Sequence, residues 1–204
     1  MRETDAIWRT LADAALIGRR EWKNTGDLAW EARVGEKIAY KALKRPIEIG
    51  AVTRHPAPAG GFSVTDPERI LTLFAASRSL RDGKRTQFEA AQNLISSTET
   101  YAIGGTRSAA HYLGGRNTIA DHAPAIIYVP LGTQLTGLPL GDDAIVMTAD
   151  QKTLDSWADG FTSPAQSYAD LFAQPGWQAS EFRRALWRNW FTVDDWSRAE
   201  VLGG

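Results

Sequence analysis

The sequence predicts an α+β fold in which helical N- and C-terminal segments surround a small mixed sheet. Apolar residues recur with the helical period near both ends of the chain, whereas two compact apolar runs of strand length, 125–129 and 144–148, lie in the middle. The sequence has no internal repeat. We therefore expect a single domain, 1–204, made of a helical pair (1–45), a mixed α/β core (46–150) and a helical C-terminal segment (151–204).

Two helices are expected at the start of the chain. Ile7, Trp8 and Leu11 fall on one face of the first helix, which the polar residues from Asn24 onward should end. Asp27 can cap a second helix that runs to Leu43, because Pro46 lacks the N–H that a longer helix needs. An antiparallel helical pair follows from this pattern.

The middle of the chain alternates between short elements and turns. Alternating apolar residues predict a half-buried strand at 47–52, and the Pro- and Gly-rich stretch 55–61 predicts a loop. Thr65 and Glu68 form a capping box with Pro67 in the first turn, so a helix should follow. Further helices are expected around 88–95 and 107–113, ahead of the buried strands 125–129 and 144–148.

The last quarter should be helical. Thr148 with Gln151, and Ser163 with Gln166, are two candidate capping boxes, and Pro164 occupies a permitted first-turn position. The Pro175–Gly176 pair should separate these helices from the last ones.

Composition excludes several kinds of chemistry. The chain contains no cysteine, so thiolate catalysis, disulfides and thiolate metal sites are absent. Its three histidines show no i, i+4 pair typical of a zinc site, so we expect no metal and no cofactor. The sequence lacks a long apolar run and a basic-then-apolar start, so we expect a soluble protein without a signal peptide. The expected location is the cytoplasm or a particle assembled there, with no membrane partner.

Charge is distributed unevenly along the chain. Residues 1–116 hold 18 Lys or Arg and 13 Asp or Glu, whereas residues 117–204 hold 5 and 11. Opposite-signed halves favour head-to-tail association between copies, but the same distribution is also compatible with ordinary solvated side chains.

One segment resembles a known enzyme class. Arg54 after a predicted strand, Ser97 within a Ser-Ser-Thr step that follows a predicted helix, and a later acidic residue are similar to the motifs of ADP-ribosyltransferases. The acidic position falls on Asp142 or Asp143, shorter than the glutamate usual in that family. The resemblance implies an enzyme with Arg54, Ser97 and Asp143 at its site and NAD as substrate. Tight turns at the neighbouring glycine pairs are the alternative interpretation.

A second pattern resembles RNA-cleaving domains of the HEPN class. Arg116 precedes His122 across a short polar segment, and in that chemistry the arginine stabilises phosphate charge while the histidine transfers protons. Gly114 and Pro124 limit any helix here to one or two turns, so a loop histidine is the alternative.

The C-terminal quarter is rich in tryptophan. Arg183, Trp187 and Arg188 lie in one arginine- and tryptophan-rich run, a composition enriched at protein interfaces. Acidic neighbours favour a protein partner or self-association and leave nucleic-acid binding open. The leading interpretation is a non-enzymatic assembly or interaction protein, such as a structural component of a virus particle. An ADP-ribosyltransferase-like enzyme and an RNA-cleaving enzyme are the alternatives.

Overall fold

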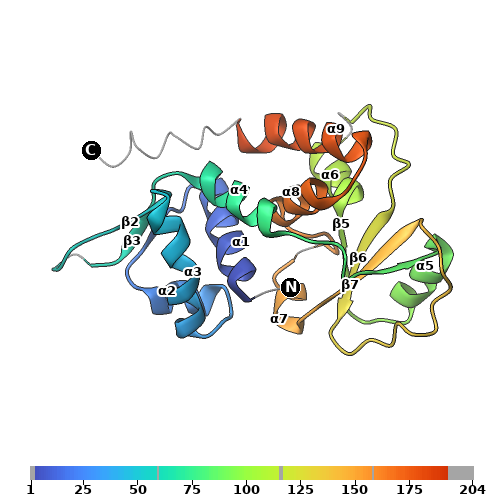
Figure 1. Ribbon diagram of the computed structural model, residues 1–204, viewed down its shortest axis with the longest axis horizontal. Coiled ribbons are helices and arrows are strands. Elements are labelled where there is room, and N and C mark those ends of the chain that lie inside the picture. The colour runs from blue at the N-terminus through green and yellow to red at the C-terminus, as the bar shows by residue number, and fades with distance from the viewer. Residues whose placement is uncertain (1–2, 59, 115–116, 158, 193–204) are drawn as a thin grey trace. The chain divides into compact units, whose positions relative to one another are not determined.

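The structure is a computed structural model that describes residues 3–58, 60–114, 117–157 and 159–192. Helices and two small sheets confirm the predicted α+β class (Figure 1). The chain packs as two compact units, Met1–Ser77 with Trp190–Gly204, and Arg78–Asn189. These boundaries differ from the three predicted segments, and the interpretation of the whole chain as one domain stays a prediction.

The first unit combines helices with a small antiparallel sheet. Strand β3 lies between β1 and β2, and the apolar faces of the helices form the core around Ile7, Leu11, Leu43 and Phe74, all fully buried. The elements of this unit are, in chain order, α1 (Glu3–Leu16), β1 (Glu21–Trp22), α2 (Thr25–Glu31), α3 (Glu36–Glu48), β2 (Val52–Arg54), β3 (Phe62–Val64) and α4 (Pro67–Ser77).

The predicted helical pair is wrong, because three helices and a strand occupy this part of the chain. Helix α1 ends early, where Gly18 takes φ 79° and the N–H groups of Gly18 and Arg19 donate to the carbonyls of Ala15 and Ala14. Asn24, rather than Asp27, caps α2 by accepting a hydrogen bond from the Asp27 N–H. A turn at 32–35 then separates α2 from α3.

Pro46 lies inside α3, so the prediction that it ends the helix is wrong. A proline at this position leaves the carbonyl of Ala42 without its usual helical donor. The indole Nε1–H of Trp8 fills that role, donating to the Ala42 oxygen at 2.9 Å. The indole of Trp8 in α1 therefore gives the Ala42 carbonyl the hydrogen bond that Pro46 cannot donate, and α3 continues to Glu48.

Two neighbouring predictions are corrected in part. Residues 47–48 belong to α3, so the strand expected at 47–52 is only β2, which begins at Val52. Helix α4 is confirmed, but Asp66 rather than Thr65 accepts from the Arg69 N–H, while the Thr65 hydroxyl donates to the Gly50 carbonyl.

The second unit is built on a mixed four-stranded sheet in the order β4-β7-β6-β5. The central strands β6 and β7 are parallel, and both edge strands run antiparallel to their neighbours. Its elements are β4 (Lys84–Thr86), α5 (Phe88–Ser96), β5 (Ala102–Gly104), α6 (Gly105–Leu113), β6 (Ala125–Pro130), β7 (Ala144–Ala149), α7 (Gln151–Leu154), α8 (Pro164–Ala173), α9 (Trp177–Leu186) and a π-helical turn (Trp187–Phe191) that crosses the unit boundary.

Both faces of this sheet are buried, which explains the continuous apolar runs of β6 and β7. Ile127, Val129 and Val146 pack with apolar residues of α5 on one face, and Tyr128 and Met147 pack with Trp157 on the other. The two predicted strands are thus confirmed. Asp150 caps α7, which corrects the predicted Thr148 cap, and the Ser163 cap of α8 is confirmed.

Candidate nucleic-acid interface

Helices α2 and α3 form a helix-turn-helix in the first unit. The four-residue turn at 32–35 contains Arg33 in a left-handed conformation, φ 55°, and Gly35 at the N-cap of α3. Two packed helices joined by so short a turn, with glycine at its end, have the connection typical of this motif. Leu28 and Ala29 of α2 are buried along with Ala39 of α3, which fixes the pair against the unit's core.

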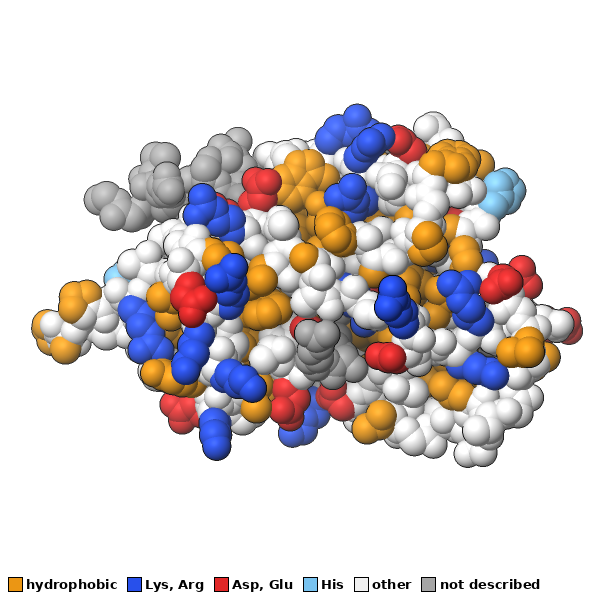
Figure 2. All heavy atoms as spheres, viewed as in Figure 1, with side chains coloured by type: hydrophobic (Ala, Val, Ile, Leu, Met, Phe, Trp, Pro, Cys, Tyr) orange, Lys and Arg blue, Asp and Glu red, His pale blue; other side chains and the backbone are white. Residues whose placement is uncertain are grey.

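The outward face of α3 carries an uninterrupted basic stripe. Lys37, Lys41 and Lys44 recur at helical spacing opposite the buried residues Ala39 and Leu43, and all three are exposed. Among the described residues none of these lysines forms an ion pair. Lys and Arg side chains gather on the face of the molecule where α2 and α3 lie (Figure 2). The stripe is thus an uncompensated positive surface on a rigid helix.

Tyr40 joins the stripe to the neighbouring hairpin. Its ring is half exposed, with the Arg54 guanidinium carbon 5.1 Å and the Lys44 Nζ 5.7 Å from the ring centroid. Cation–π contacts of this kind at exposed sites contribute about 0.5–1 kcal/mol each. Tyr40 therefore holds two positive charges from different elements near one another, an arrangement that favours an anionic group between them.

The β2–β3 hairpin has a fixed base and an exposed tip. Phe62 stacks on Trp22 of β1, with ring centroids 5.5 Å apart and planes inclined by 11°. Gly61 takes φ 78°, and a Cβ there would collide with the Trp22 carbonyl oxygen, so only glycine fits. Figure 1 shows the hairpin projecting beyond the helices of the first unit.

The C-terminal end of α3 is fixed by charged side chains. Arg69 of α4 donates from Nη1 to the Ile49 carbonyl at 2.8 Å and pairs with Asp66 at 3.0 Å. Arg45 pairs with Glu48 at 3.2 Å, so the carboxylate at the end of the helix is compensated locally. A shallow groove of about 570 Å³ lies here, lined by Ile49, Leu73 and the charged side chains around them.

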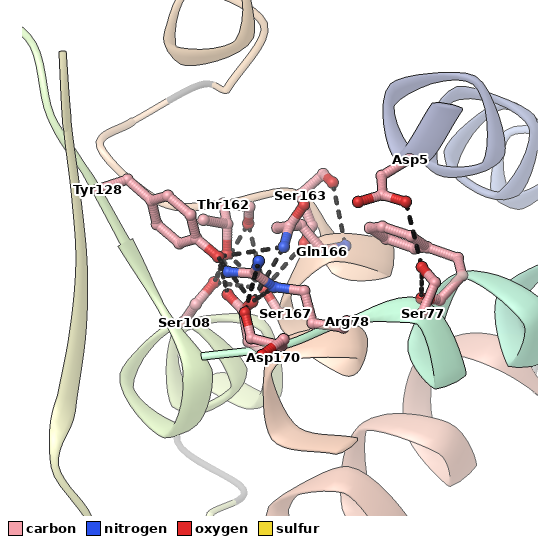
Figure 3. A network of polar contacts seen from close by, with 12 residues as sticks. Asp5, Ser77, Arg78, Ser108, Tyr128, Thr162, Ser163, Gln166, Ser167 and Asp170 are labelled. Carbon is pink, nitrogen blue, oxygen red and sulfur yellow. Dashed lines mark hydrogen bonds and ion pairs between the residues drawn. The ribbon is translucent and has the colours of Figure 1, made fainter. Parts of the chain in front are cut away.

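The second unit contains a closed polar network rather than an open site (Figure 3). Arg78 Nε donates to Asp170 Oδ1 at 2.7 Å, and the Tyr128 hydroxyl lies 2.6 and 2.8 Å from the two carboxylate oxygens. Arg78 Nη2 and Gln166 Nε2 donate to the Tyr128 oxygen, and Gln166 Nε2 also donates to Asp170. The network joins β6 to α8 through the first residue of this unit.

Burial and charged neighbours together raise the pKa of both Tyr128 and Arg78 in this network. Burial raises the pKa of Tyr128 well above its usual value, and the nearby Asp170 raises it further against the opposing effect of Arg78. Burial alone would lower the pKa of Arg78, but Tyr128 and Asp170 outweigh it and raise the pKa. The Arg78 and Asp170 side chains are 4% and 0% exposed, so no substrate reaches them, and the network serves to fix α8 on the sheet.

The three residues suggested by the ADP-ribosyltransferase resemblance lie in different elements. Arg54 is the last residue of β2 in the first unit, where it stacks on Tyr40. Ser97 is the C-cap residue that follows α5 in the second unit, and its hydroxyl donates to the Leu94 carbonyl. Asp143 precedes β7, and its backbone carbonyl accepts from Ala125. Within the described ranges no hydrogen bond or ion pair connects Ser97 with Asp143.

The residues suggested by the RNA-cleaving pattern are only partly described. Arg116 lies outside the described residues. His122 is exposed in the irregular segment before β6, so no helix carries it.

The C-terminal candidates do lie together. The Arg183 guanidinium carbon is 5.8 Å from the Tyr168 ring centroid and 5.2 Å from that of Phe172, and the Trp187 ring lies 5.8 Å from Tyr168. Arg188 follows Trp187 and is exposed. Trp187 is therefore part of a cluster of rings between α8 and the end of α9.

Sequence reasoning missed the basic stripe of α3. The sequence does place the three lysines at positions i, i+4 and i+7, a spacing that puts them on one face of a helix. The predicted single helix ending at Leu43 did not include Lys44, so this shared face was not identified. The described part of the chain contains no helix long and apolar enough to cross a membrane. It also contains no group of three or more His, Cys, Asp or Glu side chains arranged to hold a metal ion.

Comparison with known proteins identifies no relative: no family model, no curated protein and no solved structure matches this chain.

Proposed function

We propose that this chain is a non-enzymatic DNA-binding protein whose first unit is a winged helix-turn-helix. The observation that carries the proposal is the basic stripe of Lys37, Lys41 and Lys44, presented on the second helix of a helix-turn-helix beside a projecting hairpin. In this motif the second helix lies in the major groove of duplex DNA, which is wide enough to admit an α-helix. The hairpin is then the wing that flanks the helix.

The geometry assigns roles along α3. Residues near the start of a recognition helix contact base edges, so Glu36 and Tyr40 are the candidates for reading sequence. A carboxylate such as that of Glu36 accepts a hydrogen bond from the cytosine amino group. The phosphates of the DNA backbone, which fix orientation without reading sequence, are then contacted by Lys37, Lys41, Lys44 and the hairpin's Arg54.

Four side-chain cations in contact with phosphates determine how strongly the DNA affinity depends on salt. Each contact contributes about 0.9 to the slope of log affinity against log salt, so Lys37, Lys41, Lys44 and Arg54 together give a slope of about −4. Affinity should then fall by roughly two orders of magnitude between 50 and 200 mM salt. A base-reading contribution appears separately, as the ratio of affinities for a selected site and for random duplex.

The test is selection from a library of random duplexes, followed by fluorescence anisotropy on the enriched sequence and on a random pool. We compare Lys41→Gln with Arg81→Gln, which removes one exposed positive charge from the second unit instead. We expect Lys41→Gln to weaken binding to both duplexes and Arg81→Gln to leave it unchanged. Failure to bind any duplex at 50 mM salt, or equal losses in both variants, contradicts the proposal.

The enzymatic alternatives stay predictions. No described contact favours the NAD or RNA chemistry over the DNA-binding proposal. The assembly interpretation is compatible with DNA binding, because many helix-turn-helix proteins act as pairs on two half-sites.

A further inference from the structure

A basic aromatic patch covers one side of the α8–α9 pair. The patch consists of Phe172, Arg183, Tyr168 and Trp187, linked in that order by the cation–π and ring contacts described above. Phe172 is 46% exposed, and Arg183 Nη1 lies 3.4 Å from the Tyr168 hydroxyl. Figure 2 shows hydrophobic side chains next to Lys and Arg over the region of these helices.

The charge of the patch is positive. Arg183, Arg184 and Arg188 lie on α9 and the turn that follows, whereas Glu181, which pairs with Arg184 at 2.6 Å, is the one acidic residue described between Trp177 and Asn189. Arg183 thus lies beside the exposed ring of Phe172 and in a cluster with the partly buried ring of Trp187, and arginine together with aromatic rings is a composition enriched at interface hot spots. A partner surface that fits the basic aromatic patch is therefore both apolar and acidic.

The same chain carries such a segment between β6 and β7. Leu140 is 80% exposed, the Asp142 side chain is 87% exposed, and Asp143 is exposed as well. We call this segment, residues 140–143, the acidic knob. Its only described ion pair is that of Asp142 with Arg85, at 3.2 Å on the surface. Such exposed pairs contribute about 0–1 kcal/mol, so Asp142 stays available.

The acidic knob is held in a fixed conformation. The Thr86 hydroxyl donates to the Pro139 carbonyl at 2.7 Å on one side, and the Asp143 carbonyl accepts from Ala125 at 2.9 Å on the other. Gly141 packs so closely on the backbone of Gln87 that a Cβ would lie 2.6 Å from the Gln87 nitrogen. A preorganised segment loses little conformational entropy when it docks.

We infer that the basic aromatic patch of one copy binds the acidic knob of a second copy, so that the chain self-associates head to tail. Leu140 fits against the Phe172 and Trp187 rings, while Asp142 and Asp143 face Arg183 and Arg184. Figure 1 shows α9 and the segment between β6 and β7 far apart within the second unit, so one copy cannot satisfy both surfaces itself. Both surfaces belong to the second unit, and the inference does not rest on DNA binding.

The contact joins two different surfaces, so it propagates from copy to copy rather than closing as a symmetric dimer. A knob of four residues buries less than the standard interface of about 1,600 Å², so each contact is weak and concentration-dependent. Its charged part is screened by salt, because the Debye length falls from about 10 Å at 0.1 M to about 3 Å at 1 M.

The experiment is sedimentation velocity of the full chain without DNA, at rising concentration and at low and high salt. Two charge-reversed variants are compared: Arg183→Glu with Arg184→Glu, and Asp142→Arg with Asp143→Arg. We expect the wild-type weight-average mass to rise above the 22.4 kDa of one chain at low salt and to fall back at high salt. Each variant alone should stay at the mass of one chain.

The decisive measurement is the sedimentation velocity of a mixture of the two variants. The reversed patch then meets the reversed knob, so association should return to the wild-type level, which a misfolded variant could not produce. Circular dichroism of each variant checks that the fold is intact. A wild-type chain that stays monomeric at every concentration, variants that associate as the wild type does, or a mixture that behaves like its separate components overturns the inference.

Discussion

Replacing Asp170 with asparagine tests the role of the buried network. The substitution keeps the shape of the side chain but removes the negative charge that faces the Arg78 guanidinium at 2.7 Å. Both side chains are almost completely buried, so water cannot replace the lost carboxylate. Asp170→Asn therefore leaves an uncompensated buried cation and removes the charged acceptor of the Tyr128 hydroxyl.

The expected loss follows from these contacts. Breaking a buried ion pair by removing one partner costs about 3–5 kcal/mol, whereas a surface pair costs under about 1 kcal/mol. For a unit of this size a loss of 1 kcal/mol lowers Tm by about 4 °C, so Asp170→Asn should lower it by roughly 12–20 °C. Replacing both partners, as Arg78→Met with Asp170→Leu, removes the orphaned charge and should recover most of that loss.

Urea unfolding followed by tryptophan fluorescence and by far-UV circular dichroism measures these differences. Trp157, one of eight tryptophans in the chain, packs edge-on against Tyr128 with centroids 5.0 Å apart, so part of the emission change comes from the surroundings of the network. Glu181→Gln, which breaks an exposed pair with Arg184, serves as the matched control and should cost less than about 1 kcal/mol. A loss below 1 kcal/mol for Asp170→Asn, or a double variant no more stable than Asp170→Asn alone, refutes this reasoning.

Three further predictions concern single contacts. Trp8→Phe removes the donor to the Ala42 carbonyl and should lower the free energy of urea unfolding by about 1–3 kcal/mol. The loss should be clearly smaller in a Pro46→Ala background, because residue 46 regains the N–H that bonds to this carbonyl. Equal losses in the two backgrounds contradict the role of Trp8. Gly61→Ala should destabilise the hairpin, because alanine is strained at this positive φ and its Cβ collides with the Trp22 carbonyl. Proteolysis within 55–61 should then become faster than in the wild-type chain. An unchanged cleavage rate argues against the tight packing at Gly61. Folding raises the pKa of Tyr128, so the contribution of the neutral phenol to the unfolding free energy is complete below the unfolded tyrosine pKa of about 10 and is lost as the pH rises above it. The unfolding free energy of the wild-type chain should therefore fall more steeply above pH 10 than that of Tyr128→Phe. Parallel curves of unfolding free energy against pH for the two proteins contradict the burial of the phenol.

The fold was predictable where local pattern and burial agree. Strands β6 and β7 are apolar on both faces, and Ser163 caps α8 with a proline in the first turn, so these features can be read from the sequence. The edge strands β4 and β5 are three residues long, and Lys84–Thr86 contains two charged residues, so no alternating pattern indicates them. Their pairing with β7 and β6 is decided by the completed sheet.

The candidate interface was hidden by two tertiary effects. Arg33 adopts a left-handed conformation that costs a residue with a side chain about 1 kcal/mol, and Gly35 is the one helix-breaking residue in the sequence between α2 and α3. A proline normally ends a helix, and the hydrogen bond that Pro46 cannot donate to Ala42 is supplied by the indole of Trp8, 34 residues before Ala42. Without the turn and the full length of α3, the lysines could not be assigned to one exposed face. Arg54 was singled out from the sequence, but its contact with Tyr40 appears only when β2 packs near α3 in the folded unit.

The salt dependence of DNA binding tests the central claim most directly. The wild-type chain and the variant Lys37→Gln with Lys41→Gln and Lys44→Gln are titrated against one labelled duplex by fluorescence anisotropy from 50 to 300 mM salt. Each phosphate-contacting lysine contributes about 1 to the slope of log affinity against log salt, so the triple variant should lose about 2–3 of a wild-type slope near −4. An unchanged slope in a folded triple variant, or no measurable binding by the wild-type chain, contradicts the assignment of α3 as the DNA-binding helix.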